Sequence, residues 1–100
     1  MAIADVQEKN GWIIVYDSSN RELSKMSSSS KILLGAGNDF FIISHAGWFI
    51  TYDEKGREIN KMSDTGKEFK GAIGSNFTIK YNGWLVVYDK NCKEISKRSA

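Results

Sequence analysis

The chain repeats itself with a period of 36 residues, and no insertion breaks the phase. Each of three copies carries a Gly-Trp pair, a Tyr-Asp pair and a Glu-x-x-Lys segment at the same spacing; the pairs begin at Gly11, Gly47 and Gly83. A fixed period of this length is typical of repeat architectures, in which each unit buries its apolar face only against its neighbours. The sequence therefore predicts a single repeat domain over residues 1–100, with units at about 1–30, 31–66 and 67–100.

Each full copy contains four short segments rich in β-branched and aromatic residues and bounded by turn residues; in the middle copy they are residues 31–36, 40–45, 48–53 and 57–62. Such segments predict strands, and no stretch shows a 3.6-residue apolar period of helical length. The first copy supplies only three strands, and it carries Asp5, Gln7 and Lys9 where the other copies have Phe, Ile and His or Tyr. We expect an atypical capping or edge strand there, because terminal repeats usually differ from internal ones.

Two-residue turns recur before each tryptophan. Asn10-Gly11 and Asn82-Gly83 join apolar runs, and Asn-Gly favours a type I′ hairpin because both turn positions need a positive φ. Ala46-Gly47 takes this place in the middle copy, where alanine fits a positive φ poorly, so a different turn type is open there.

A second turn follows each Tyr-Asp pair. Residues 53–57 predict a type I turn closed by a glycine bulge at Gly56, and Asn20 and Cys92 stand at the equivalent positions. We interpret Cys92 as a turn residue, since a reactive thiol would need an electropositive setting. Cys92→Gly is then expected to leave stability unchanged or to raise it by up to ~1 kcal/mol.

The third segment of each copy is apolar on both faces, as where Trp48 and Tyr52 alternate with Phe49 and Thr51. A strand of this kind is sandwiched between layers. The fourth segment is more polar, and the first contains the small pair Gly35-Ala36, which suits close backbone approach. A small inner strand, two double-sided middle strands and a polar outer strand are typical of a β-propeller blade. We therefore expect an all-β fold of antiparallel propeller-like blades, with a β-trefoil or a closed antiparallel barrel as alternatives.

Composition excludes several classes of function. The net charge is +2, and Lys and Arg alternate with Asp and Glu, whereas a nucleic-acid binder shows a concentrated basic stripe. The longest apolar runs, such as residues 40–43, are too short to span a bilayer. Residues 1–10 lack the apolar run of a signal peptide, and the single cysteine cannot form an internal disulfide. We therefore expect a cytoplasmic protein that binds neither nucleic acid nor membranes.

The motif Gly-Trp-x-[Ile/Val]-x-Tyr-Asp-x-x-[Gly/Asn]-[Arg/Lys]-Glu-[Ile/Leu] resembles the bacterial WG-type repeats, most closely at residues 48–59. Here the tryptophan-glycine order is inverted, and the proline common after Glu-Ile is absent. The resemblance implies a β repeat scaffold used for binding, without an assigned chemistry or a catalytic residue.

The repeated aromatic residues are the candidate ligand-binding residues: Trp12, Trp48, Trp84, Tyr16, Tyr52 and Tyr88. They would act as stacking platforms in a repeat lectin or another small-ligand binder. Alternatively, they form the core between repeats, which their strand positions favour, and Trp84→Ala is then expected to cost ~3–5 kcal/mol.

No residue pattern points to an enzyme, a metal or a cofactor. The carboxylate pairs, such as Asp53 with Glu58, recur in every copy, whereas an active site is normally singular, so we assign them to turns and cross-strand pairs. His45 has no second ligand or nucleophile near it in sequence. Three blades do not close a propeller, so we expect exposed blade faces or closure by a partner, with a homodimer of about six blades as the first hypothesis. The predicted function is a non-enzymatic protein-interaction or self-assembly module.

Overall fold

The computed structural model describes residues 3–99, which form three antiparallel sheets and no helix. The first sheet, blade 1, contains β1 (Asp5–Lys9), β2 (Trp12–Tyr16) and β3 (Glu22–Ser27). Blade 2 contains β4 (Ile32–Ala36), β5 (Phe40–His45), β6 (Trp48–Asp53) and β7 (Glu58–Ser63). Blade 3 contains β8 (Lys67–Ile73), β9 (Asn76–Tyr81), β10 (Trp84–Asp89) and β11 (Glu94–Ser99).

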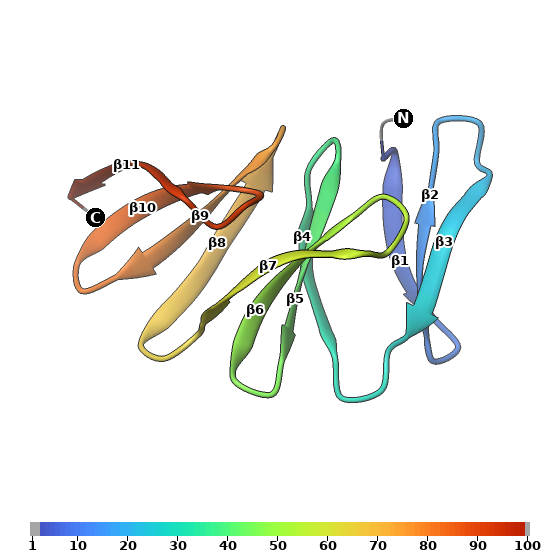
Figure 1. The fold of residues 1–100 in the computed structure, drawn as a ribbon, viewed down its shortest axis with the longest axis horizontal. Helices are drawn as coiled ribbons and strands as arrows, with labels where there is room; N and C mark the ends of the chain where they lie inside the picture. The colour runs from blue at the N-terminus through green and yellow to red at the C-terminus, as the bar shows by residue number, and fades with distance from the viewer. Residues whose placement is uncertain (1–2, 100) are drawn as a thin grey trace.

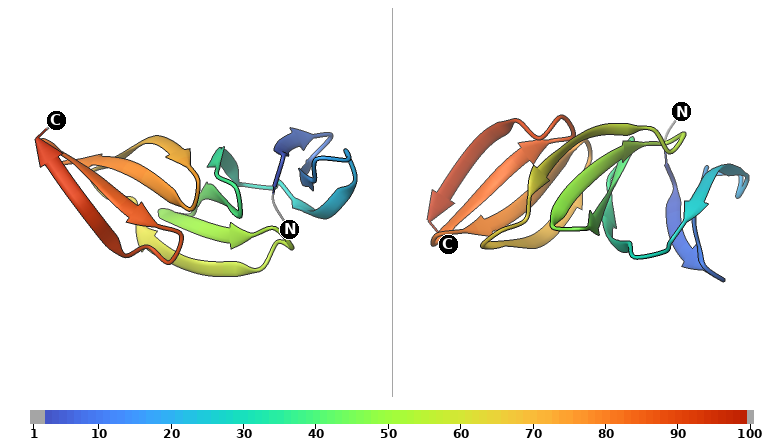
Figure 2. Two further views of the ribbon diagram at one scale, coloured as in Figure 1. Left: turned by 90° about the horizontal axis from the view of Figure 1, so that it is seen from above. Right: turned by 60° about the horizontal axis from the view of Figure 1, so that its bottom comes forward.

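The blades follow one another along the longest axis of the molecule, as Figure 1 shows from blade 1 in blue to blade 3 in red. Both views in Figure 2 show the blades in the same order, and the strands within each sheet are twisted. Strands in each sheet pair in sequence order, so every blade is a meander. The expected all-β fold of propeller-like blades is confirmed, and the described residues form three separate sheets, not one closed barrel or a trefoil.

The turns that set the strand register adopt the conformations that the sequence predicts. Asn10 and Asn82 have φ of 52°, and Gly56 has φ of 78° in the second kind of turn. Ala46 has φ of 51°, so the turn of the middle copy is of the same type as the Asn-Gly turns. The expectation that this turn could be of a different type is therefore wrong. The neighbouring strands impose this strained φ because their pairing leaves only two residues for the turn.

Two apolar clusters hold the blades together, and each lies between two neighbouring sheets. Between blades 1 and 2, the buried residues are Ile3, Ile13, Val15, Phe41 and Ile43. Between blades 2 and 3, they are Phe40, Ile42, Phe49, Phe77 and Ile79. Blade 2 contributes opposite faces of β5 to the two clusters, which is why this strand is apolar at every position from 40 to 43.

Polar groups also join adjacent blades. The Thr51 hydroxyl, which is fully buried, donates to the Lys90 carbonyl at 2.7 Å. The Asn38 N–H donates to the Gly74 carbonyl at 2.7 Å. A Cβ at Gly37 would collide with that carbonyl oxygen, so only glycine permits this approach of the two inner turns.

Candidate functional site

The three tryptophans lie at the rims of the blades and not in the core. Trp12 and Trp84 are 43% exposed and Trp48 is 40% exposed, so the expectation that their rings form the core between repeats is wrong. The buried centre comes instead from positions such as Phe49 and Ile50, further along the same strands.

A lysine covers each indole ring. The ammonium nitrogens of Lys25, Lys61 and Lys97 lie 4.9, 4.7 and 5.1 Å from the ring centroids of their tryptophans. Sequence reasoning missed these cation–π pairs, although both partners recur with the repeat. A sugar that stacked on the ring would have to displace the lysine.

The three tyrosines are not equivalent to one another. Tyr52 stacks on Phe41 with ring centroids 5.3 Å apart, and Tyr88 stacks on Phe77 at 5.5 Å. Burial between the blades raises the pKa of both tyrosine hydroxyls above the ordinary value of 10.0. Tyr16 belongs to the end blade, whose corresponding face has no neighbouring sheet among the described residues. The set therefore does not form three equal platforms.

One cavity does bring together two of the predicted site residues. It has a volume of about 310 Å³ and is lined by Tyr81, Asn82, Trp84, Val86, Tyr88, Glu94 and Lys97. Aromatic rings beside a carboxylate and an ammonium are groups that suit a small polar ligand. Equivalent residues in blade 2 include His45 and Ala46 in place of Tyr81 and Asn82, so the chemistry is particular to blade 3.

The recurring aspartates are structural turn residues, as the sequence indicates. An Asp17 carboxylate oxygen accepts the backbone N–H groups of Ser19 and Arg21, each at 2.9 Å, and Asp53 accepts those of Lys55 and Arg57 in the same way. The hydrogen bond from Arg21 is the main cause that holds the pKa of Asp17 below 3.8. Burial alone would raise the pKa of Asp53, but the backbone donors hold it below 3.8.

The remaining polar side chains serve the fold. The His45 Nδ1 lies 2.8 Å from the Ser30 carbonyl oxygen. Cys92 has φ of 62° at its turn, packs against the second apolar cluster, and burial raises the pKa of its thiol. Within residues 3–99, no group of three or more His, Cys, Asp or Glu side chains could hold a metal ion. The same residues contain no helix that is long and apolar enough to cross a membrane.

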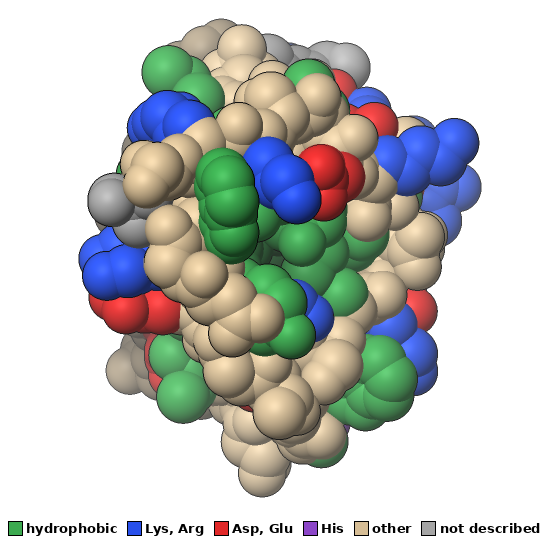
Figure 3. All heavy atoms as spheres, turned by 90° about the vertical axis from the view of Figure 1, so that its left-hand side faces the viewer, with side chains coloured by type: hydrophobic (Ala, Val, Ile, Leu, Met, Phe, Trp, Pro, Cys, Tyr) green, Lys and Arg blue, Asp and Glu red, His purple; other side chains and the backbone are tan. Residues whose placement is uncertain are grey.

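The outer side of blade 3 is the first open surface. We call it the C-terminal end face, and it comprises Lys70, Thr78, Lys80, Leu85, Val87, Ile95, Ser96 and Arg98. Leu85 occupies the position at which blade 2 buries Phe49, and Ile95 is 53% exposed. A hollow of about 420 Å³ includes Leu85 and Arg98, and Figure 3 shows hydrophobic side chains in the centre of this side with charged side chains around them.

The outer side of blade 1 is the second open surface. We call it the N-terminal end face, and it comprises Asp5, Gln7, Lys9, Trp12, Ile14 and Tyr16, which pair across β1 and β2, together with Lys25 of β3 over Trp12. Its β1 residues stand where blade 2 buries Phe41 and Ile43, which confirms the expected atypical strand.

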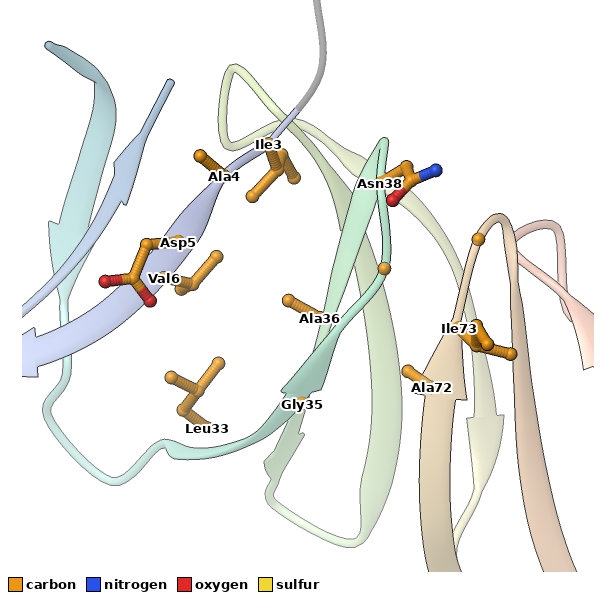
Figure 4. Close-up of a pocket in the computed structure, with 12 residues that line it drawn as sticks. Ile3, Ala4, Asp5, Val6, Leu33, Gly35, Ala36, Asn38, Ala72 and Ile73 are labelled. Carbon is orange, nitrogen blue, oxygen red and sulfur yellow. The ribbon is translucent and has the colours of Figure 1, made fainter. Parts of the chain in front are cut away.

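Blade 1 also has an open inner edge. β1 pairs only with β2 in the part of the chain that the structure describes, whereas β5 and β9 each pair on both sides. A cavity of about 490 Å³ lies beside β1, and its lining includes Ile3, Val6, Leu33 and Ala36. Figure 4 shows side chains from β1 and β4 pointing into this gap.

Neither a family model nor a curated protein matches this sequence. Among solved structures, the chain is similar to BamB from Moraxella catarrhalis, a β-propeller protein. The TM-score is 0.52 at 16% sequence identity, and the match covers 95% of this chain and 34% of BamB. The chain thus spans about a third of the length of that protein, and the likeness shows the fold alone: the three sheets are arranged as propeller blades.

Proposed function

We propose that the chain is a non-enzymatic protein-interaction module that assembles with a second copy of itself. The C-terminal end face of each copy would pack on the N-terminal end face of the other. Two such contacts would join roughly six blades, a number found in closed propellers. The observation that carries the proposal is the apolar centre of the C-terminal end face, where Leu85 and Ile95 lie at positions that blades 1 and 2 bury or half-bury.

Two further features support this orientation. The Ser24 hydroxyl of blade 1 donates to the Glu54 carbonyl of blade 2 at 2.9 Å, and Ser96 presents the equivalent hydroxyl on the exposed side of blade 3. At the rims, Lys70 and Arg98 of the C-terminal end face would meet Asp5 of the N-terminal end face, which also carries Lys9. An apolar centre with a charged rim is typical of a protein interface.

The test is the solution mass of the purified chain at micromolar concentration. The proposal predicts twice the chain mass of 11.3 kDa. Leu85→Lys should give single chains, because it places a charge in the apolar centre. Ile32→Lys is the matched control, since Ile32 is 62% exposed and belongs to neither end face. A mass of 11.3 kDa for the unaltered protein would contradict self-assembly.

A small polar ligand is the second candidate, and the cavity beside Trp84 favours it. This candidate predicts one saturable site per chain in a titration with simple sugars, followed by tryptophan fluorescence. Trp84→Phe should abolish the fluorescence change, whereas Trp48→Phe should preserve it. Three equal sites per chain would instead favour the recurring tryptophans as platforms.

We also propose a cytoplasmic location and kinship with the WG-type repeats. The single free cysteine supports the location, and the repeat motif supports the kinship.

A further inference from the structure

The inner edge of blade 1 differs from that of the other two blades. β4 and β8 are the inner strands of blades 2 and 3, and blade 1 has no counterpart among residues 3–99. We propose that β1 accepts an extended segment of a partner protein as a fourth, antiparallel strand that completes blade 1. This inference rests on the proposed protein-interaction function and identifies the kind of partner that it would take.

The open hydrogen-bonding groups of β1 follow from its hairpin. Lys9 and Trp12 flank the two-residue turn, so they form a hydrogen-bonded pair in the ladder. Because such pairs alternate with non-bonded pairs, the peptide groups of Val6 and Glu8 face away from β2. An open row of N–H and C=O groups binds an added strand through main-chain hydrogen bonds.

Space for the added strand lies beside these groups. The cavity of about 490 Å³ extends between β1 and β4, and its lining contains Val6, Leu33 and Ala36 together with the polar residues Asp5 and Asn38. Figure 4 shows Val6 and Leu33 approaching one another across this gap. Side chains that alternate towards the gap would contact Val6 and Leu33, and such side-chain contacts give specificity in strand addition.

The complete blades show the register that the added strand would adopt. In blade 2, Gly35 pairs with Ile42 and Ala36 pairs with Phe41; in blade 3, glycine and alanine occupy the same places. The equivalents of Ile42 and Phe41 in blade 1 are Val6 and Asp5. The added strand, which we call the guest strand, would therefore place Gly opposite Val6 and Ala opposite Asp5.

The surroundings of the guest strand determine the residue type at two further positions of its sequence. Leu34, directly before Gly35, packs against the cluster between blades 2 and 3, so the equivalent guest residue would point between blades 1 and 2 and should be apolar. Ile32 pairs with Ser44, whose equivalent in blade 1 is Glu8. Opposite charges stabilise a cross-strand pair, so a basic guest residue is favoured there. The partner segment has the pattern basic-x-apolar-Gly-Ala.

The experiment uses a fluorescent synthetic peptide with the sequence of residues 31–37, in which Ile32→Lys supplies the basic residue. Saturable binding to the full chain is expected, with changes in the amide signals of Val6 and Glu8. Glu8→Ala removes the carboxylate that faces the basic residue of the peptide but keeps the main-chain donor, so it is the reference variant. Glu8→Pro should bind about tenfold more weakly than Glu8→Ala, because it also removes one main-chain donor at the open edge, where proline is tolerated.

A second pair of peptides tests the same idea on the unaltered protein, so the result does not depend on folding of Glu8→Pro. Gly35→Pro in the peptide should abolish binding, because Gly35 pairs directly with Ile42 in blade 2, and Leu34→Lys should weaken it. The inference is overturned if the first peptide fails to saturate, if Gly35→Pro binds equally well, or if a second copy already protects the Val6 and Glu8 amides from exchange.

The outcome is separable from that of the proposed self-assembly. Single chains that bind the peptide would contradict the dimer and support strand addition. If the chain forms a dimer that Leu85→Lys dissociates, and this dimer does not bind the peptide, the dimer is supported and strand addition is overturned.

Discussion

The two ends of the blade stack differ in where their polar residues lie. At the N-terminal end, they lie on both strands that flank β2: Asp5 and Gln7 of β1 stand where blade 2 buries Phe41 and Ile43, and Lys25 of β3 covers Trp12. At the C-terminal end, polar residues such as Arg98 lie around a centre that remains apolar at Leu85.

This difference means that the two ends are not interchangeable. Two C-terminal end faces would bring Lys70 and Arg98 of one copy towards the same charges of the other, which costs free energy. A C-terminal end face that packs on an N-terminal end face would meet Asp5 as well as Lys9, beside an aromatic surface.

The largest expected effect is on the free energy of unfolding, and it distinguishes a buried residue between the blades from a residue at the rim of the same blade. Phe77 is 1% exposed, and Phe77→Ala should lower the free energy of unfolding by ~3–5 kcal/mol. Trp84→Ala should cost only ~1–2 kcal/mol, because its ring is 43% exposed and mainly contacts a lysine. Urea unfolding measures the free energy of unfolding of both variants. If the two variants lose equal stability, Trp84 contributes as much as a core residue.

The next expected effect comes from making the N-terminal end resemble an internal face. Asp5→Phe combined with Gln7→Ile restores the residue types of blade 2 at these positions. Two added apolar side chains should tighten association by at least about tenfold, measured by sedimentation equilibrium. Unchanged association would show that this face takes no part in assembly.

Acid sensitivity should be shared by the turns of blades 1 and 2. The folded pKa values of Asp17 and Asp53 lie below 3.8, so their contribution to stability is present above that pH and is lost as the pH falls through the folded values. Unfolding curves at pH 7 and pH 3 should differ less for the Asp17→Asn, Asp53→Asn double variant. An undiminished difference would assign the acid sensitivity to other groups, such as Asp39 with its Lys90 partner.

The smallest expected effect concerns Cys92. Its φ of 62° favours glycine, but its half-buried side chain packs against the second apolar cluster. Cys92→Gly should therefore change the free energy of unfolding by less than ~0.5 kcal/mol, because relief of backbone strain offsets lost packing. A calorimetric melting temperature that drops by several degrees would show that packing dominates.

Much of the fold could be predicted from local patterns. The strand predicted at residues 57–62 is β7 at Glu58–Ser63, and the one at 48–53 is β6 without any shift. Turn residues determine register because a positive φ is accessible to few residue types, as at Asn10 and Gly56. The candidate site was less predictable, since a strand apolar on both faces does not reveal which of its residues lies at a rim, and Trp48 was misplaced for that reason.

The sequence by itself determined the period, the turns and the atypical residues of the strand at Asp5–Lys9, because all three follow from residue identity and spacing. Only the tertiary structure decided that lysines cover the tryptophans, that Tyr52 and Tyr88 lie between blades while Tyr16 lies at an end, and that a cavity lies beside β1. Those outcomes depend on which blade lies against which face, and identical local motifs differ in exposure according to whether a neighbour covers them.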